Sequence, residues 1–166
     1  MDTGFKNIVD TLKATRAISR DQFVSLLETD GEEEKEYLFE AAREVSEQIF
    51  HKEVYLRGLI EFTNYCKNNC YYCGIRCGNA SADRYRLTEE EILSCCEIGE
   101  KIGFKTFVLQ GGEDPFFTDE KICDLVRKIK EKHPSCAVTL SIGEKSYESY
   151  KKYFEAGADR YLLRHE

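Results

Sequence analysis

Residues Leu59 to Cys73 read LIEFTNYCKNNCYYC, a short apolar run followed by three closely spaced cysteines. The apolar residues predict a buried β-strand at 59–62. The cysteines Cys66, Cys70 and Cys73 then lie on the loop that leaves this strand, with the spacing C-x3-C-x2-C. Three thiolates on one loop can hold three irons of an iron–sulfur cubane and leave the fourth iron open to a small molecule.

Two other metal sites are compatible with these cysteines taken alone. Adding Cys77 gives C-x3-C-x2-C-x3-C, so four thiolates could hold the zinc ion of a structural knuckle or the cluster of a non-catalytic electron carrier. A ferredoxin cluster, however, has the spacing C-x2-C-x2-C-x3-C-P, and Gly78 stands at the position of that proline. The spacing therefore favours a cluster with one open iron, and both alternatives stay open.

Composition and charge argue against several classes of protein. The chain has 166 residues, a net charge of −7 and no block of Lys and Arg, which argues against nucleic-acid binding. No apolar run approaches the roughly 18 residues that span a membrane, and the N-terminus lacks the apolar segment of a secretory signal. We therefore predict a cytoplasmic protein whose other cysteines fill the core, namely Cys95, Cys96, Cys123 and Cys136.

Two regions of different pattern divide the chain. Residues 1–54 predict a helical N-terminal extension, with a capping box at Ser19-x-x-Gln22 and a helix end at Gly31. Residues 55–166 alternate between strand and helix patterns. We predict strands at 59–62, 106–110, 137–141 and 161–163, separated by helices that begin after Thr88, Thr118 and Ser146.

The repeated strand–helix units predict an α/β fold with a parallel sheet and right-handed crossovers. Four strands do not close a barrel, and a parallel sheet needs cover on both faces. We therefore predict the N-terminal half of a TIM-type (β/α) barrel, made of about four βα units and apparently truncated after Glu166.

Further candidate binding residues follow the other predicted strands, at the edge where barrels and open α/β folds place their chemistry. Gly111 and Gly112 come directly after the second strand and allow the backbone to approach a ligand closely. Polar or charged side chains accompany them at the ends of the second, third and fourth strands: Glu113, Ser141, Glu144 and Arg164. A tight turn or a solvated charge explains each one singly, but with the cysteines they predict one site.

Five segments together resemble the radical SAM superfamily: IEFTNYCKNNCYYCGIR, RYRLTEEEI, VLQGGEDP, TLSIGE and EAGADRYLLRHE. They are similar in particular to the E-type radical SAM maturase of FeFe-hydrogenase, over residues 55–166. The GEDP, SIGE and RYLLRHE segments favour this maturase over biotin synthase and methylornithine synthase, which share the general layout. Cys77 departs from the family pattern, in which a basic residue is expected after CGIR.

The resemblance implies an enzyme with two cofactors. Cys66, Cys70 and Cys73 would hold a 4Fe–4S cluster, and S-adenosylmethionine (SAM) would bind the open iron through its amine and carboxylate. Reductive cleavage of SAM would give a 5′-deoxyadenosyl radical that attacks the substrate, and no catalytic side chain is assigned. The implied SAM contacts are Tyr72 beside the adenine, Gly111, Gly112 and Glu113 at the amine, Ser141 and Glu144 at the ribose, and Arg164 at the carboxylate.

The partners implied are those of hydrogenase maturation. They are a small-molecule or iron-complex substrate on the way to the H-cluster, an electron donor such as reduced ferredoxin or flavodoxin, and other maturation factors, with no nucleic acid and no membrane. The alternatives are a biotin synthase-like or methylornithine synthase-like enzyme and, outside the enzymes, an iron–sulfur electron carrier. Because half of the barrel is expected to be missing, we expect little activity from this chain alone. No role is assigned to His165.

Overall fold

The computed structural model describes residues 2–164, so His165 lies outside the described residues. The chain divides into two compact units, Met1–Val54 and Tyr55–Glu166. Neither unit has, within the described residues, a helix long and apolar enough to cross a bilayer.

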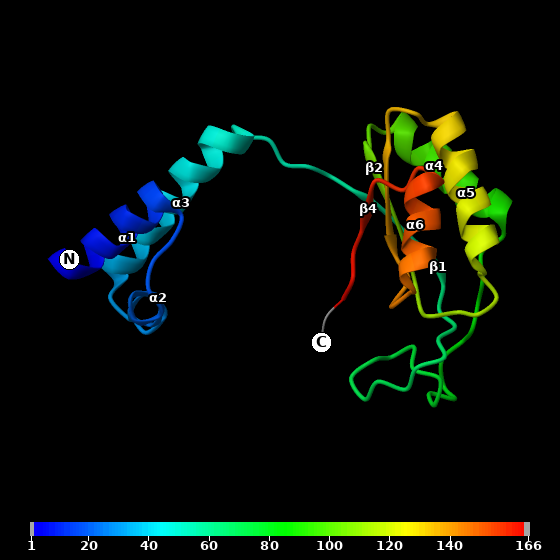
Figure 1. Cartoon of the computed structure of the whole chain (residues 1–166), viewed down its shortest axis with the longest axis horizontal. Helices are drawn as coiled ribbons and strands as arrows, with labels where there is room; N and C mark the ends of the chain where they lie inside the picture. Colours follow the sequence, from blue (N-terminus) through cyan, green and yellow to red (C-terminus); the bar gives the residue numbers. More distant parts are fainter. Residues whose placement is uncertain (1, 165–166) are drawn as a thin grey trace. The chain divides into compact units, whose positions relative to one another are not determined.

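The N-terminal unit is helical, but the prediction that Gly31 ends a helix was wrong, because the second helix stops at Leu27 and Gly31 is the N-cap of the third. The unit consists of α1 (Thr3–Thr15), α2 (Arg20–Leu27) and α3 (Glu32–Phe50) (Figure 1). The predicted capping box is present, since Ser19 accepts from the N–H of Gln22 and the Gln22 side chain accepts from the N–H of Ser19. The three helices bury a small core centred on Phe5, Val9 and Leu26.

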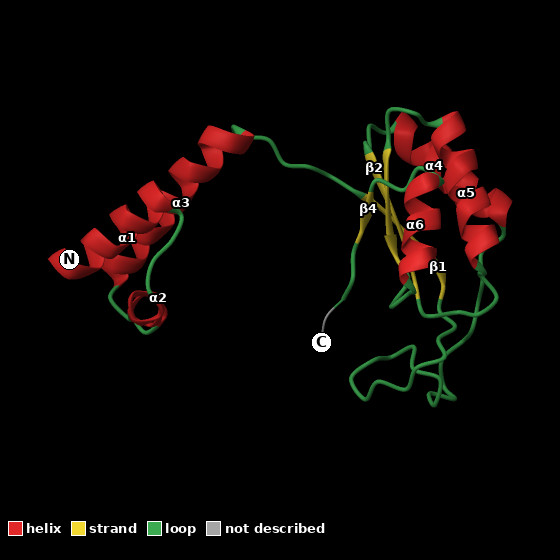
Figure 2. Ribbon diagram, viewed as in Figure 1, coloured by secondary structure: helices red, strands yellow, loops and turns green. Residues whose placement is uncertain are grey.

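The C-terminal unit is a parallel sheet of four strands in the order β1-β2-β3-β4. Strands and helices alternate along the chain as β1 (Gly58–Thr63), α4 (Glu89–Lys101), β2 (Thr106–Gly111), α5 (Asp119–Lys132), β3 (Ala137–Ser141), α6 (Tyr147–Glu155) and β4 (Arg160–Tyr161). The three helices cover one face of the sheet (Figure 2). The predicted α/β fold is confirmed.

The fourth strand is shorter than predicted. It comprises Arg160 and Tyr161, which pair with Thr139 and Leu140 of β3, in place of the predicted 161–163. Leu162 still donates its N–H to the carbonyl oxygen of Leu140, but β3 ends at Ser141 and leaves little further strand to pair with.

The core of this unit lies between the sheet and its helices. Alternate strand residues fill it from one side and the apolar faces of the helices from the other, including Ile60, Phe62, Phe107, Leu109, Val138, Leu140, Ile92, Ile122 and Ile129. On the opposite face of β1, Leu59 is 55% exposed. The sheet therefore presents a partly open inner face, as expected of part of a barrel.

Three of the four cysteines predicted in the core are buried there, namely Cys96, Cys123 and Cys136. Burial raises the pKa of Cys96 to about 12, so this thiol stays protonated and inert. The prediction for Cys95 was wrong, because its side chain is exposed. Adjacent helical residues point about 100° apart, so the neighbour of a buried residue on α4 faces solvent.

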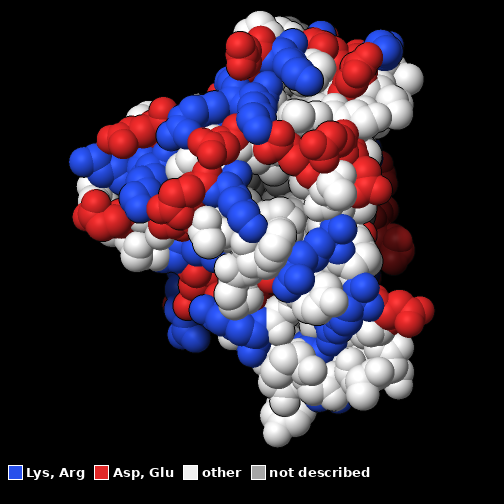
Figure 3. All heavy atoms as spheres, turned by 90° about the vertical axis from the view of Figure 1, so that its right-hand side faces the viewer, with Lys and Arg blue, Asp and Glu red and all other residues white. Residues whose placement is uncertain are grey.

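Charges of both signs alternate on the outer surface of this unit. The view in Figure 3 shows Lys and Arg side chains interspersed with Asp and Glu, without a large area of one sign. Several of them form exposed ion pairs, such as Lys128 with Glu89 at 2.5 Å and Arg127 with Asp124 at 2.6 Å. Such pairs favour solubility and contribute little to the stability of the fold.

Candidate metal and cofactor site

The cysteine loop, residues 64–79, leaves the C-terminal end of β1 and carries all three predicted ligands. Turn hydrogen bonds shape it, since Cys73 donates its N–H to the carbonyl of Cys70 at 3.0 Å and Arg76 donates to that of Cys73 at 3.2 Å. Cys66 and Cys73 are half-buried and Cys70 is exposed, and all three thiols are free. The loop therefore presents unpaired thiols in a folded arrangement.

A short antiparallel segment closes the base of this loop. Thr63 forms an isolated β-bridge with Arg86, and Leu87 donates its N–H to the carbonyl of Phe62 at 2.8 Å. The Asn64 side chain accepts from the N–H of Tyr85 at 2.8 Å and donates to the carbonyl of Asp83 at 2.6 Å. Two segments about twenty residues apart in sequence thus meet beneath the cysteines.

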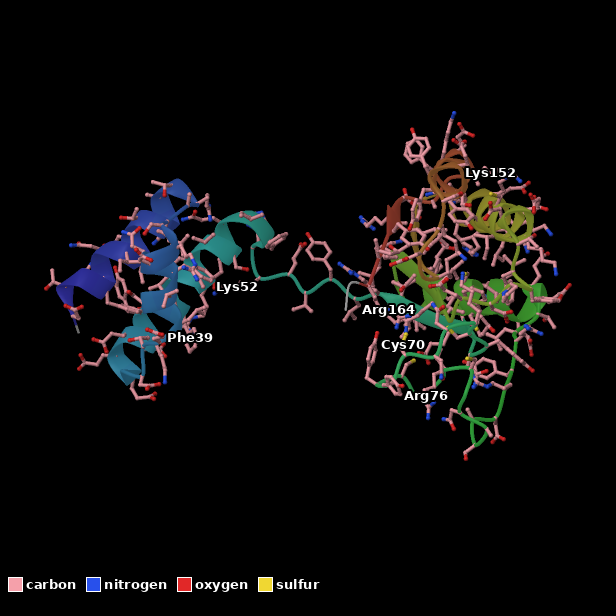
Figure 4. The ribbon with its side chains drawn as sticks, turned by 60° about the horizontal axis from the view of Figure 1, so that its bottom comes forward. Phe39, Lys52, Cys70, Arg76, Lys152 and Arg164 are labelled. Atoms are coloured by element: carbon pink, nitrogen blue, oxygen red, sulfur yellow. The ribbon has the colours of Figure 1, made fainter. Side chains whose placement is uncertain are left out.

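A cavity of about 520 Å³ opens between this loop and the ends of the following strands, within the roughly 300–1,000 Å³ of small-molecule sites. Figure 4 shows Cys70, Arg76 and Arg164 at one end of the unit, away from Lys152 of α6. Nine of the ten predicted site residues line the cavity: Cys66, Cys70, Tyr72, Cys73, Gly111, Gly112, Glu113, Glu144 and Arg164.

The geometry of the thiols separates the possible metal sites. Among the described side chains, no three His, Cys, Asp or Glu converge closely enough to hold one metal ion. A structural zinc site uses four ligands on the same ion, whereas three cysteines of this loop line the cavity. A cubane binds each thiolate through a different iron, and Cys66, Cys70 and Cys73 all line the same cavity, as the three protein ligands of such a cluster would.

Cys77 differs from the other three cysteines of the loop in that it does not line the cavity. Its backbone N–H donates to the carbonyl of Asn68 at 2.9 Å, but its side chain is exposed and does not line the cavity. This position does not favour a site with four thiolates, and it agrees with three protein ligands and one open iron.

The segment at the end of β2, residues 111–115, is the glycine loop, and Gly112 is required for its contact with the cysteine loop. A Cβ at this position would overlap the carbonyl oxygen of Tyr65 and lie 2.7 Å from the Cβ of Cys66. The role of this glycine at the amine of a ligand stays a prediction, to which the structure adds that a Cβ here would meet protein backbone. A side chain at Gly112 would therefore displace the first cysteine as well as disturb the cavity.

Glu113 connects the two loops through its carboxylate and its backbone. Its carboxylate accepts from Asn68 Nδ2 at 2.8 Å, pairs with Lys67 Nζ at 3.0 Å and accepts from the N–H of Glu144 at 3.3 Å. Its own N–H points to Cys66 Sγ at 3.4 Å. Burial raises the pKa of this carboxyl, but these hydrogen bonds outweigh burial and hold the pKa below its usual value.

Glu144 and Arg164 complete the cavity wall from the far side. The turn before Glu144 contains Gly143 with φ of +81°, where a Cβ would overlap the side chain of Glu113. Arg164 approaches the glycine loop, with its Nη2 3.5 Å from the carbonyl oxygen of Gly111. The wall therefore combines a carboxylate and a guanidinium, groups suited to hydroxyls and to a carboxylate respectively.

Ser141 is the predicted site residue that does not line the cavity. Its side chain is fully buried at the end of β3, and its Oγ has no hydrogen-bond partner among the described residues. The assignment of this hydroxyl to a ribose stays a prediction, to which the structure adds an unused hydrogen-bonding group.

Three charged residues of the site had no role in the sequence analysis. Asp114 is buried and binds Arg86 through both carboxylate oxygens, at 2.6 and 2.9 Å. The Arg86 guanidinium stacks over Tyr65 with its carbon 3.9 Å from the ring centre. Arg84 donates to four carbonyl groups of the cysteine loop. Asp114 lies in the GEDP segment, and Arg84 and Arg86 lie in the RYRL segment. Membership of these segments was the only feature of the sequence that could have pointed to the three residues.

Comparison with known proteins agrees with this geometry. Residues 60–165 match the family model of the radical SAM superfamily. The chain is 44% identical over 151 residues to the [FeFe] hydrogenase maturase subunit HydE of Thermotoga maritima, covering 91% of this chain and 43% of that protein. It is 34% identical over 151 residues to a 3-methylornithine synthase of Methanosarcina acetivorans, covering 90% of this chain and 43% of that protein.

A solved structure shares the fold. The crystal structure of HydG, a maturase of the [FeFe]-hydrogenase, superposes with a TM-score of 0.85 at 30% identity, covering 96% of this chain and 36% of that one. The chain therefore spans less than half the length of these relatives, and its four strands correspond to part of a TIM-type barrel.

Proposed function

The chain belongs to the radical SAM superfamily, whose members use a 4Fe–4S cluster and SAM, and from this premise we propose that it holds the cluster through Cys66, Cys70 and Cys73. The observation that carries the proposal is the single cavity that these thiols share with the glycine loop, Glu144 and Arg164. When bound, the cluster supplies the electron that cleaves SAM reductively.

The residues of the chain would orient SAM and limit its exposure to water. Arg164 offers a planar pair of donors to the carboxylate of SAM, and the backbone of Gly111 and Gly112 lines the space for its amine. Glu144 is available for ribose hydroxyls, and Tyr72, which is 69% exposed, for the face of the adenine. Glu113 would keep the two loops together as a carboxylate already bound to Lys67 and Asn68.

We propose further that the complete enzyme acts in maturation of the FeFe-hydrogenase active site. The identity to the HydE maturase subunit, 44% against 34% for 3-methylornithine synthase, supports this reading over the methylornithine alternative. The substrate would then be a small molecule or iron complex, and the partners a reducing protein and other maturation factors. The test is to add the complete enzyme to an extract that lacks only its E-type factor and to measure whether an apo-hydrogenase becomes active. If the hydrogenase stays inactive, the result counts against the maturase role.

The cluster ligands are tested by substitution. Replacing Cys66, Cys70 or Cys73 by Ala should abolish the iron–sulfur absorption after anaerobic reconstitution, because a cubane with an open iron has no spare protein ligand. Cys77→Ala is the matched control and should keep the full iron and sulfide content, since its side chain lies outside the cavity. Loss of the cluster in the Cys77 variant would instead support a carrier with four thiolates.

A further inference from the structure

The Arg84 side chain binds the backbone of the cysteine loop at four carbonyl groups and does not line the cavity. Its Nη1 donates to the carbonyls of Asn64 at 2.5 Å and Ile75 at 2.8 Å. Its Nη2 donates to the carbonyls of Arg76 at 2.7 Å and Asn79 at 3.2 Å. A guanidinium has four N–H groups on these two nitrogens, so each finds a backbone acceptor.

The four acceptors lie on both sides of the cysteines in the sequence. Asn64 precedes Cys66, whereas the other three acceptors follow Cys73. One side chain therefore joins the entrance of the loop to its exit. The segment that carries Arg84 is itself fixed to Asn64, through the N–H of Tyr85 and the carbonyl of Asp83.

We infer that Arg84 is a positioning residue that holds the cysteine loop in its ligand-presenting shape before the cluster binds. The inference rests on the proposed function for the identity of the ligand, but the contacts themselves involve only the chain. A loop of this length that is not held in place in the apo-protein would lose conformational entropy when it binds the cluster. A clamp already formed in the apo-protein reduces that loss and slows release of the cluster.

Lysine should not replace this arginine. Its ammonium is a single point with three donors, whereas the four carbonyls are met by a planar fork of two nitrogens. Arg76 provides a matched control on the same loop, because its guanidinium donates to a side chain, Asn69 Oδ1 at 3.2 Å, and not to the backbone carbonyls that Arg84 joins. Three variants therefore distinguish the possible causes. Arg84→Lys keeps the charge but loses the planar fork, and Arg84→Gln loses both. Arg76→Gln removes a guanidinium elsewhere on the same loop.

The first measurement is amide hydrogen exchange of the apo-protein, followed separately over 64–79 and over β2 and β3. We expect Arg84→Gln and Arg84→Lys to speed exchange of the loop by at least about tenfold, since hydrogen bonds to a charged group are among the stronger ones. Arg76→Gln should match the wild type, and the strands should be unchanged in every variant. Wild-type exchange of the loop in both Arg84 variants would overturn the inference, as would an equal rise in loop and strands.

The second measurement is the rate at which a ferrous chelator removes iron from the reconstituted proteins. Both Arg84 variants should lose iron at least about tenfold faster than wild type and Arg76→Gln, because a loosened loop releases its cluster more often. Equal rates in all four proteins would overturn the role in cluster retention. If the wild type takes up no cluster, the proposed function fails, and the exchange measurement still decides whether Arg84 holds the loop.

Discussion

Asp114 joins the glycine loop to the base of the cysteine loop through a carboxylate side chain that is only 1% exposed. It accepts from Thr63 Oγ1 at 2.8 Å, from Arg86 at two atoms and from the N–H of Phe116 at 3.0 Å. These partners come from three segments of the chain. One buried charge therefore fixes the distance between the two loops that form the cavity.

Removing the Arg86 guanidinium from these contacts should destabilise the fold. We expect Arg86→Ala to lower the free energy of unfolding by about 1.5–3 kcal/mol, because Asp114 stays buried with only its neutral donors. Arg127→Ala is a matched control, since Arg127 and Asp124 form a pair that is 60% exposed on both sides, and it should cost about 0–1 kcal/mol. Urea denaturation measures both, and equal losses would show that burial of Asp114 adds nothing.

The same carboxylate predicts a pH dependence. Burial raises the pKa of Asp114, but the hydrogen bonds from Arg86 and Thr63 outweigh it and hold the pKa below its usual value. The stabilisation is therefore complete above the unfolded pKa and is lost as pH falls from about 4 through the lower folded value. Asp114→Asn should flatten the acid side of the stability curve, and an unchanged slope below pH 4 would contradict this assignment.

The residues that the sequence reveals and those it conceals differ in what they contact. Cys66, Cys70 and Cys73 are recognisable because metal binding restricts both residue type and spacing. Arg84 and Arg86 are ordinary charged residues in a polar segment, and their roles depend on partners about five to thirty positions away in the chain. Only the fold brings these partners together.

The helices of the C-terminal unit begin where their caps predict. Thr88, Thr118 and Ser146 each accept a backbone N–H of the following turn, so local sequence sufficed for α4, α5 and α6. The loop between β1 and α4 has no such periodicity, and its shape comes from contacts with Asn64, Arg84 and Asp114. Propensity therefore predicts the elements, whereas the long functional loop could not be described from sequence alone.

The first residue of α5 also connects this helix to α6. Asp119 accepts from Tyr153 Oη at 2.5 Å and from Ser149 Oγ at 2.8 Å. Burial raises the pKa of the Asp119 carboxyl, but these hydrogen bonds outweigh burial and hold the pKa below its usual value. Burial also raises the pKa of Tyr153, so the phenol remains a donor to this carboxylate.

Tyr153→Phe should therefore loosen the contact between two helices without opening a cavity. We expect a loss of about 1.5–3 kcal/mol in the free energy of unfolding, because one charge-assisted hydrogen bond disappears inside the helix layer. Tyr147→Phe on the same helix is the control, since Tyr147 is 77% exposed, and should stay within about 0.5 kcal/mol. Thermal unfolding of both variants gives the comparison, and a Tyr153 variant as stable as the control would refute the helix link.

At the scale of the molecule, the described C-terminal unit contains the whole cysteine loop and the glycine loop but only one covered face of its sheet. Leu59 on β1 and Leu162 after β4 are 55% and 48% exposed, although both are large apolar residues. The chain also covers 43% of the HydE relative from Thermotoga maritima. The residues proposed to bind the cluster are therefore present, whereas the water exclusion required by radical chemistry is incomplete within the described strands.

We therefore predict that this chain binds the cluster but cleaves SAM slowly. After reconstitution, the 166-residue chain should hold one 4Fe–4S cluster per molecule, because its three thiols and their bracing contacts lie in the described unit; the Thermotoga maritima relative serves as the reference for turnover. Under strong reductant, the chain's formation of 5′-deoxyadenosine per cluster should be at least about tenfold slower, equivalent to about 1.4 kcal/mol in the barrier, because the exposed inner face leaves SAM open to water. Cys73→Ala of the same chain measures the background. Equal rates per cluster would show that the cavity of about 520 Å³ suffices for SAM cleavage, and that the open face of the sheet matters only for the later attack on substrate.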